Sequence, residues 1–440
     1  MRHYSMKTAL TIGLGITALA GSMAGVLAQA TTAGPATQPP APPGTTQPAP
    51  TQPQVAAPAP PGTASGAPAA PAAAPATPPP NYNIQYNGLI DGYYLFQFNN
   101  PKGSAYITGR AYDIRQNSPA LALAELNVLQ NPKPNGLGFK ATLMTGDVAD
   151  INHGAFVGLD ASGNTILVHN DGGEGRYKNV QQLYGTYALG GAGAGFDFGK
   201  FYTPFGYEVT EANGNYNYSR SVAYNYVPFY HAGARIYTPI TAVPGLTATA
   251  YLVQAIFNTP DTGVQNPNKR PGYIGQLNYT DPKGKFVLVS ELGLGKQKLS
   301  TETGPSTKIV LNDNNVTYNF NANMLAGVDY VYRKLTPDGG GKDTTNAYAV
   351  YYRQALTPKT AYALRFSGAS DKVEDGLGGS FTARPYELTA TYELKPAANF
   401  TTRLEFRHDN TNVIGSFVDK DGNLTKKQQD TLTLAGMFTF

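Results

Sequence analysis

Apolar and polar residues alternate one by one over many stretches of this 440-residue chain. In residues 386–394 (YELTATYEL), Tyr, Leu and Ala alternate with Glu and Thr, and residues 400–408 (FTTRLEFRH) continue the alternation after the turn sequence KPAAN. Successive side chains of a β-strand point to opposite faces. Each stretch therefore predicts a strand with one apolar and one polar face, and the pair predicts a hairpin.

The connections between these stretches are alternately short and long. Short turns such as 281–284 (DPKG) are separated by longer polar segments such as 257–271 and 410–428. Transmembrane β-barrels have this rhythm, with short periplasmic turns and long outer loops. We therefore predict an all-β fold, a transmembrane antiparallel β-barrel of about sixteen strands with both termini on the periplasmic side. The expected strands are residues 86–98, 120–130, 136–146, 179–189, 195–203, 231–238, 246–256, 272–280, 286–294, 308–320, 324–333, 346–355, 362–369, 385–395, 400–409 and 429–440.

The N-terminal residues predict export. Residues 1–30 contain a basic start, an apolar run and the small-x-small sequence AQA, which together are typical of a cleaved signal peptide; an uncleaved membrane anchor is the alternative. Residues 31–80 carry no charge and are rich in Pro and Ala. Such a segment cannot bury enough apolar surface to fold, so we expect a disordered spacer, or a tether that touches the cell wall. The barrel would occupy residues 81–440.

Composition excludes several kinds of function. The formal net charge of +4 is small, so nucleic acid is not an expected partner. The chain has no cysteine, which excludes disulfides, thiolate metal sites and a cysteine nucleophile. Its five histidines are scattered, and no GxSxG motif is present. We expect no metal, no cofactor and no catalytic residues.

The chain ends on an alternating apolar stretch, LTLAGMFTF at 432–440. In a closed barrel the last strand pairs with the first, so its outer face would meet outer-membrane lipid. Phe438 and Phe440 also resemble the C-terminal signal by which the barrel-insertion machinery recognises bacterial outer-membrane barrels. Both the lipid and this machinery are therefore expected partners.

Short aromatic motifs give a family resemblance. The stretches GLIDGYY (88–94), GKFYTPFGYEV (199–209), YNYSRSVAYNY (216–226) and LEFRHD (404–409) together resemble the OmpL-like family of β-barrel porins. The resemblance covers most of residues 85–440 and implies an outer-membrane porin. The proline-rich segment departs from that pattern.

Alternation also predicts which charged side chains face the lumen. The candidates are Lys140, Asp197, Arg235, Glu291, Arg353, Arg365, Glu387, Glu393, Arg403, Glu405 and Arg407. The arginines could form a positive ladder that helps anions through the channel. Alternatively, they could pair with the glutamates and hydrate the wall.

The third long loop, residues 203–230, is unusually aromatic. In porins generally the third outer loop folds inward and narrows the channel. If this loop does so, Glu208, Glu211 and Arg220 would set the local field. The loop tyrosines could stack on sugar rings, or they could pack the loop onto the inner wall. These tyrosines are Tyr207, Tyr216, Tyr218, Tyr224, Tyr226 and Tyr230.

Two functions of different class follow from these observations. A sixteen-stranded barrel is wide enough for an aqueous channel, which predicts a porin for passive diffusion of small hydrophilic solutes or ions. The alternative is an outer-membrane barrel that serves as an anchor or adhesin, with the Pro-rich arm or the outer loops as the working part. A homotrimer is common for porins, although the sequence indicates no interface.

Overall fold

The structure is a computed structural model that describes residues 83–103, 106–160, 164–169, 178–190, 193–257, 270–299 and 305–440. The predicted signal peptide (1–30) and Pro/Ala-rich segment (31–80) lie outside these residues and stay predictions. No helix in the described part of the chain is long and apolar enough to cross a membrane.

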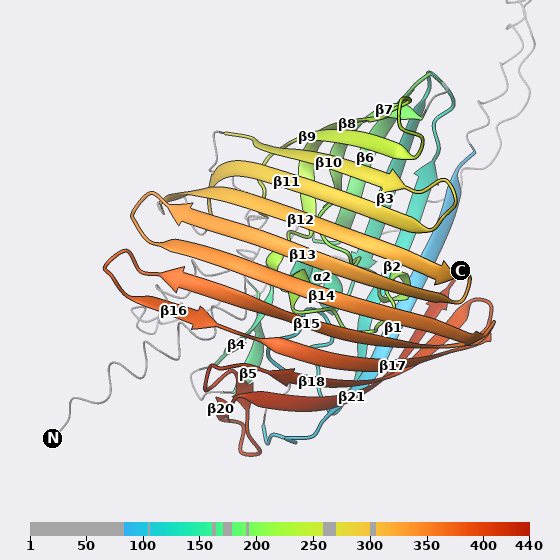
Figure 1. Cartoon of the computed structure of the whole chain (residues 1–440). Helices are drawn as coiled ribbons and strands as arrows, with labels where there is room; N and C mark the ends of the chain where they lie inside the picture. The colour runs from blue at the N-terminus through green and yellow to red at the C-terminus, as the bar shows by residue number, and fades with distance from the viewer. Residues whose placement is uncertain are drawn as a thin grey trace, which may run out of the picture. The chain divides into compact units, whose positions relative to one another are not determined.

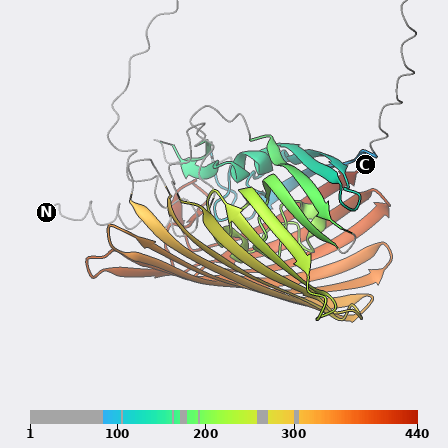
Figure 2. The same ribbon diagram turned by 90° about the horizontal axis from the view of Figure 1, so that it is seen from above.

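Sixteen antiparallel strands form one closed ring, as the sequence predicts. Figure 1 shows them side by side, and Figure 2 shows the wall that they form curving around an interior. The strands are β1 (Gln85–Gln97), β2 (Pro119–Gln130), β3 (Leu137–Thr145), β6 (Val180–Leu189), β7 (Ala194–Tyr202), β8 (Tyr230–Pro239), β9 (Leu246–Val253), β10 (Gly272–Thr280), β11 (Phe286–Lys298), β12 (Ser306–Asn321), β13 (Met324–Pro337), β14 (Lys342–Thr357), β15 (Thr360–Glu374), β17 (Tyr386–Ala397), β18 (Phe400–Asn410) and β21 (Gln428–Thr439). The short β16 (Ser380–Ala383) extends the ring only beside the end of β15.

The first and last strands close the ring. β1 pairs with β2 on one side and with β21 on the other, and backbone hydrogen bonds of 2.9 and 3.2 Å join Gly88 to Phe440. Lipid offers no hydrogen-bond partners, so a sheet can cross it only when it has no free edge. The apolar C-terminal strand is therefore paired with the first strand and leaves no open edge.

The two faces of the wall differ as the alternation predicts. On β18, Leu404 is 46% exposed on the outer face, whereas Arg403 and Glu405 are buried inside. Leu434 on β21 is 58% exposed. An outward apolar face loses no hydration in lipid, and inward charges avoid it.

Two features differ from the sequence prediction. Strands β11 to β15 extend by up to five residues into segments expected to be loops, because antiparallel pairing continues after the apolar alternation gives way to polar residues. Ion pairs support these ends, for example Lys296 with Asp338 at 2.8 Å. The loops also hold elements that the period-two pattern could not indicate: helix α2 (Asp147–Asn152) and the hairpins β4 (Phe156–Leu159) with β5 (Thr165–Val168) and β19 (Phe417–Val418) with β20 (Leu424–Lys426).

The described parts of three connections at one end of the barrel pack against its inner wall. They are loop L1 (98–118, between β1 and β2), loop L2 (146–179, between β3 and β6, which contains α2) and loop L3 (203–229, between β7 and β8). Ile107 of L1, Val148 of α2 and Phe205 of L3 are all buried in one apolar cluster with wall residues such as Leu123. The interior is thus partly filled by the chain itself.

The contact between Gly88 and Phe440 predicts a sensitive position for barrel closure. A Cβ atom at Gly88 would lie 2.3 Å from the Phe440 ring and 2.6 Å from the Glu125 carbonyl oxygen, a backbone atom that cannot move aside. We expect Gly88→Ala to lower the free energy of unfolding by about 1–3 kcal/mol, the usual cost of overpacking. The measurement is the fraction of heat-modifiable folded band during urea unfolding in detergent.

Gly275→Ala is the matched control for this variant. It also adds one methyl group on a strand, but at a position where no atom lies within 4 Å. Equal free energies of unfolding for the two variants would show that the close approach at Gly88 does not matter for closure.

Candidate functional site

Loop L3 keeps a defined conformation through its own hydrogen bonds. The Asn215 side chain accepts from the Val209 N–H at 2.9 Å and donates to the Val209 and Glu211 carbonyls at 2.8 and 3.1 Å. An asparagine side chain can satisfy a turn in this way because it presents both a donor and an acceptor. Two short 3-10 turns, η1 (Ala212–Gly214) and η2 (Ala223–Tyr226), complete the loop.

Three arginines of the wall hold this loop, and we call Arg365 (β15), Arg403 and Arg407 (both β18) the arginine latch. Arg403 donates to the carbonyls of Ala212 and Asn215 at 2.7 and 2.6 Å. Arg365 and Arg407 donate to the Ser219 and Arg220 carbonyls, both at 2.5 Å. The latch therefore binds backbone carbonyls of L3, and Arg365 also binds the Glu208 and Ser219 side chains of the loop.

Each latch arginine also pairs with a carboxylate. Arg365 lies 2.7 Å from Glu387 and 2.8 Å from Glu208 of L3, and Arg403 lies 2.8 Å from Glu393. The corresponding partner of Arg407 is Asp409, at 2.7 Å. A buried guanidinium is tolerated only when its charge and its donors are satisfied.

Glu405 on β18 also holds L3, as a hydrogen-bond acceptor. Its carboxylate accepts the backbone N–H groups of Tyr218 and Ser219 at 2.6 and 3.0 Å. Glu208 accepts the Ser221 N–H at 2.8 Å. In the structure, the latch arginines pair with glutamates instead of standing free in the lumen. The paired charges lie between L3 and the wall formed by β15, β17 and β18.

The remaining predicted charges lie in different places. Arg235 on β8 pairs with Asp197 on β7 at 2.7 Å, away from the latch, and Arg353 on β14 pairs with Glu393 at 3.1 Å. Arg220 donates back to loop carbonyls, including Val209 at 3.0 Å. The Glu211 carboxyl meets that of Glu125 on β2. The roles of these groups in solute passage stay predictions.

The loop tyrosines fall into two groups. Tyr218, Tyr224 and Tyr226 are buried, and the Tyr218 hydroxyl donates to Asp91 at 3.0 Å. Burial, together with the Asp91 carboxylate, raises the pKa of Tyr218 well above its ordinary value, so it stays a neutral donor. Tyr207 and Tyr216 are only half-buried, and Tyr207 stacks on Tyr351 at 4.4 Å between ring centroids. Only this second group could meet a solute.

Sequence reasoning missed the part that L1 plays in the interior. Arg110 of L1 pairs with Asp113 at 2.5 Å and with Asp409 of β18 at 3.0 Å, which joins L1 to the latch. Tyr112 contacts Tyr224 of L3 through their hydroxyl groups at 2.7 Å. The one available signal was the run of apolar and charged residues at 106–115 within a segment expected to be a polar loop.

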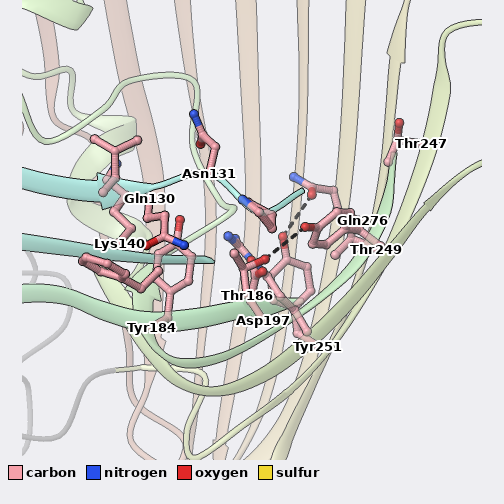
Figure 3. A pocket seen from close by; sticks show the side chains of 15 residues that line it. Gln130, Asn131, Lys140, Tyr184, Thr186, Asp197, Thr247, Thr249, Tyr251 and Gln276 are labelled. Carbon is pink, nitrogen blue, oxygen red and sulfur yellow. Dashed lines mark hydrogen bonds and ion pairs between the residues drawn. The ribbon is translucent and has the colours of Figure 1, made fainter. Parts of the chain in front are cut away.

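Two adjoining cavities remain on the part of the wall that the latch does not use. The turn-side cavity, about 400 Å³, is lined by polar groups of β2, β3 and β6 to β10, including Lys140, Tyr184 and the Asp197–Arg235 pair. Figure 3 shows its polar side chains converging on a common space. The L3 cavity, about 340 Å³, lies between L3 and β10 to β14, and Gln276 lines both cavities.

Loss of a latch arginine should destabilise the barrel. Arg403→Ala would remove the guanidinium that binds the L3 carbonyls and would leave Glu393 with its hydrogen bond from Arg353. Loss of the donor to buried acceptors costs about 1–3 kcal/mol. We expect a matching fall in the free energy of unfolding and faster proteolysis within L3. Arg384→Ala removes an exposed arginine and should change the free energy of unfolding by less than about 0.5 kcal/mol. An Arg403→Ala variant with an unchanged free energy of unfolding and an L3 that resists proteolysis would show that Arg403 does not hold the loop.

Comparisons with known proteins agree with this architecture. The anion-selective porin from Comamonas acidovorans aligns with a TM-score of 0.53 and 12% identity over 81% of this chain and 99% of that one. OmpT of Vibrio cholerae, an outer membrane protein in its trimer form, aligns with a TM-score of 0.52 and 11% identity over the same shares. These likenesses are of fold alone. A search of curated proteins finds no match.

The family model described as "Putative beta-barrel porin-2, OmpL-like" matches residues 83–440, which cover the whole ring. This confirms the resemblance carried by the aromatic motifs and places the barrel in the outer membrane as an integral protein. The chain belongs to the OmpL-like family of β-barrel porins.

Proposed function

We propose that this outer-membrane barrel is a channel for the passive diffusion of small hydrophilic solutes or ions. The observation that carries the proposal is the asymmetry of the interior. The latch holds L3 against β15, β17 and β18, while the two adjoining cavities lie along the rest of the wall. L3 narrows the lumen from one side, and the cavities supply a hydrated route on the other.

The lining of this route suits hydrated solutes. Besides Lys140 and the Asp197–Arg235 pair, the turn-side cavity carries the amides of Gln130 and Gln276. Amides and hydroxyls exchange hydrogen bonds with a passing solute without holding it strongly, which conduction requires. Stacking of a sugar ring remains an option for Tyr207 and Tyr216, which line the L3 cavity.

The same proposal implies no enzymatic activity and leaves the oligomer as an expectation. One structural neighbour is described in a trimer form, which supports a homotrimer as a proposal for this chain. The anchor or adhesin alternative depends on the Pro-rich arm or the outer loops. No contact in the described residues favours it.

Single-cysteine variants can test the channel cleanly because the chain contains no cysteine. Gln276 lines both cavities, whereas Leu277, the next residue, is 51% exposed on the outer face. In planar bilayers, wild-type protein should give stable open steps. A bulky water-soluble thiol reagent should reduce the conductance of Gln276→Cys and leave that of Leu277→Cys unchanged.

The wild type and the Gln276→Cys variant test two different parts of the proposal: that the barrel conducts, and that the route follows these cavities. A folded wild-type barrel that never opens would contradict the diffusion channel. Mass spectrometry shows whether the thiol of Gln276→Cys has reacted. If it has reacted and the conductance is unchanged, the solute route does not pass through these cavities.

A further inference from the structure

Three carboxyl groups on adjacent strands lie beside the L3 cavity without a positive partner. They are Glu291 (β11), Asp313 (β12) and Asp329 (β13), and we call them the acidic triad. Glu291 and Asp313 are register partners, and the Asp313 and Asp329 carboxyls face each other. All three side chains are buried, with residue exposures of 1%, 0% and 2%.

Among the described residues, the triad differs from the carboxylates that pair with the latch. Glu387, Glu393 and Asp409 each pair with an arginine, but no ion pair reaches any member of the triad. Glu291 Oε2 has no hydrogen-bond partner among the described residues. A buried acceptor without a donor is costly, so a ligand that brings a donor to Glu291 would be favoured there.

The L3 cavity lets a ligand reach the triad. Glu291 lines it, and its Oε1 atom is held by the Gln276 amide at 3.0 Å. The other carboxylate in the lining, Glu208, is already neutralised by Arg365. No lysine or arginine lines the cavity among the described residues. Of the described lining residues, Glu291 is therefore the carboxyl group that has no positive partner.

Aromatic rings give the cavity a second feature that suits a cation. Tyr207, Tyr216 and Tyr351 line it, with Tyr207 and Tyr351 stacked on each other. The hydroxyl of Thr317 fixes that of Tyr207 at 2.9 Å. Gly327 makes room for this ring, because a Cβ there would fall 2.3 Å from the Tyr207 hydroxyl oxygen. Ring faces attract ammonium groups.

We propose that the L3 cavity binds the ammonium group of a small organic cation, with Glu291 as its carboxylate partner and Asp313 and Asp329 adding negative potential from behind. A primary ammonium has three donors and no acceptor, which complements a site of carboxylate oxygens, amide oxygens and tyrosines. The described residues form no cluster suited to a metal ion, which favours an organic cation as the occupant. The inference rests on the proposed channel, whose solutes it would place among amines.

The test uses 1,4-diaminobutane as the probe and 1,4-butanediol as its uncharged counterpart. Titration calorimetry on the folded chain in detergent measures binding whether or not the barrel conducts. We expect the diamine to bind, the diol not to bind, and Glu291→Gln to weaken diamine binding by about tenfold or more, because the site would lose its charge-assisted hydrogen bond. Asp313→Asn should weaken binding less.

Glu374→Gln is the matched control, because it removes one carboxylate from a half-buried position at the end of β15, outside the lining of the cavity. It should bind the diamine as the wild type does. In bilayers the diamine should reduce the current of the wild type and the control, but not that of a folded Glu291→Gln variant.

The outcomes for the site and for the channel are distinguishable. Diamine binding by a barrel that never opens would support the site and contradict the channel. A conducting barrel that binds diamine and diol alike, or whose diamine affinity is unchanged in Glu291→Gln, would overturn the site and leave the channel standing.

Discussion

The pairing of β1 with β21 is the interaction on which the rest of this structure depends. A sheet in lipid must satisfy every backbone N–H and C=O group itself, so an open edge cannot persist. Closure fixes which face of every strand is inside, and it thereby collects buried charges such as Arg365 and Glu405 in one interior. The close fit of Phe440 over Gly88 shows how little space that seam leaves.

The interior is organised by charge rather than by an apolar core alone. Arg403 and its neighbours hold the backbone of L3, because carbonyl groups and carboxylates can satisfy a guanidinium that the lumen has removed from bulk water. The loop is attached through its backbone and through the Glu208 and Tyr218 side chains. The loop side chains, Tyr207 and Tyr216 among them, can then line the remaining space.

The two sides of the lumen therefore have different chemistry. Beside β15, β17 and β18, charges of opposite sign neutralise one another under L3. Beside β11 to β13, the acidic triad has no such partner, and Glu291 reaches the L3 cavity. The proposed route would pass amides, tyrosines, Lys140, the Asp197–Arg235 pair and Glu291. The selectivity of the proposed channel would arise there.

The sequence by itself determined the barrel, its sixteen strands and which residues face inward, because alternation and turn length are local properties of the chain. It also identified L3 and the charges that meet it. Only the tertiary structure decided which charges pair, since Arg403 finds L3 carbonyls almost 190 positions away in the chain. It alone revealed the inward packing of L1 and the isolation of Glu291, because closure, not spacing along the chain, brings those groups together.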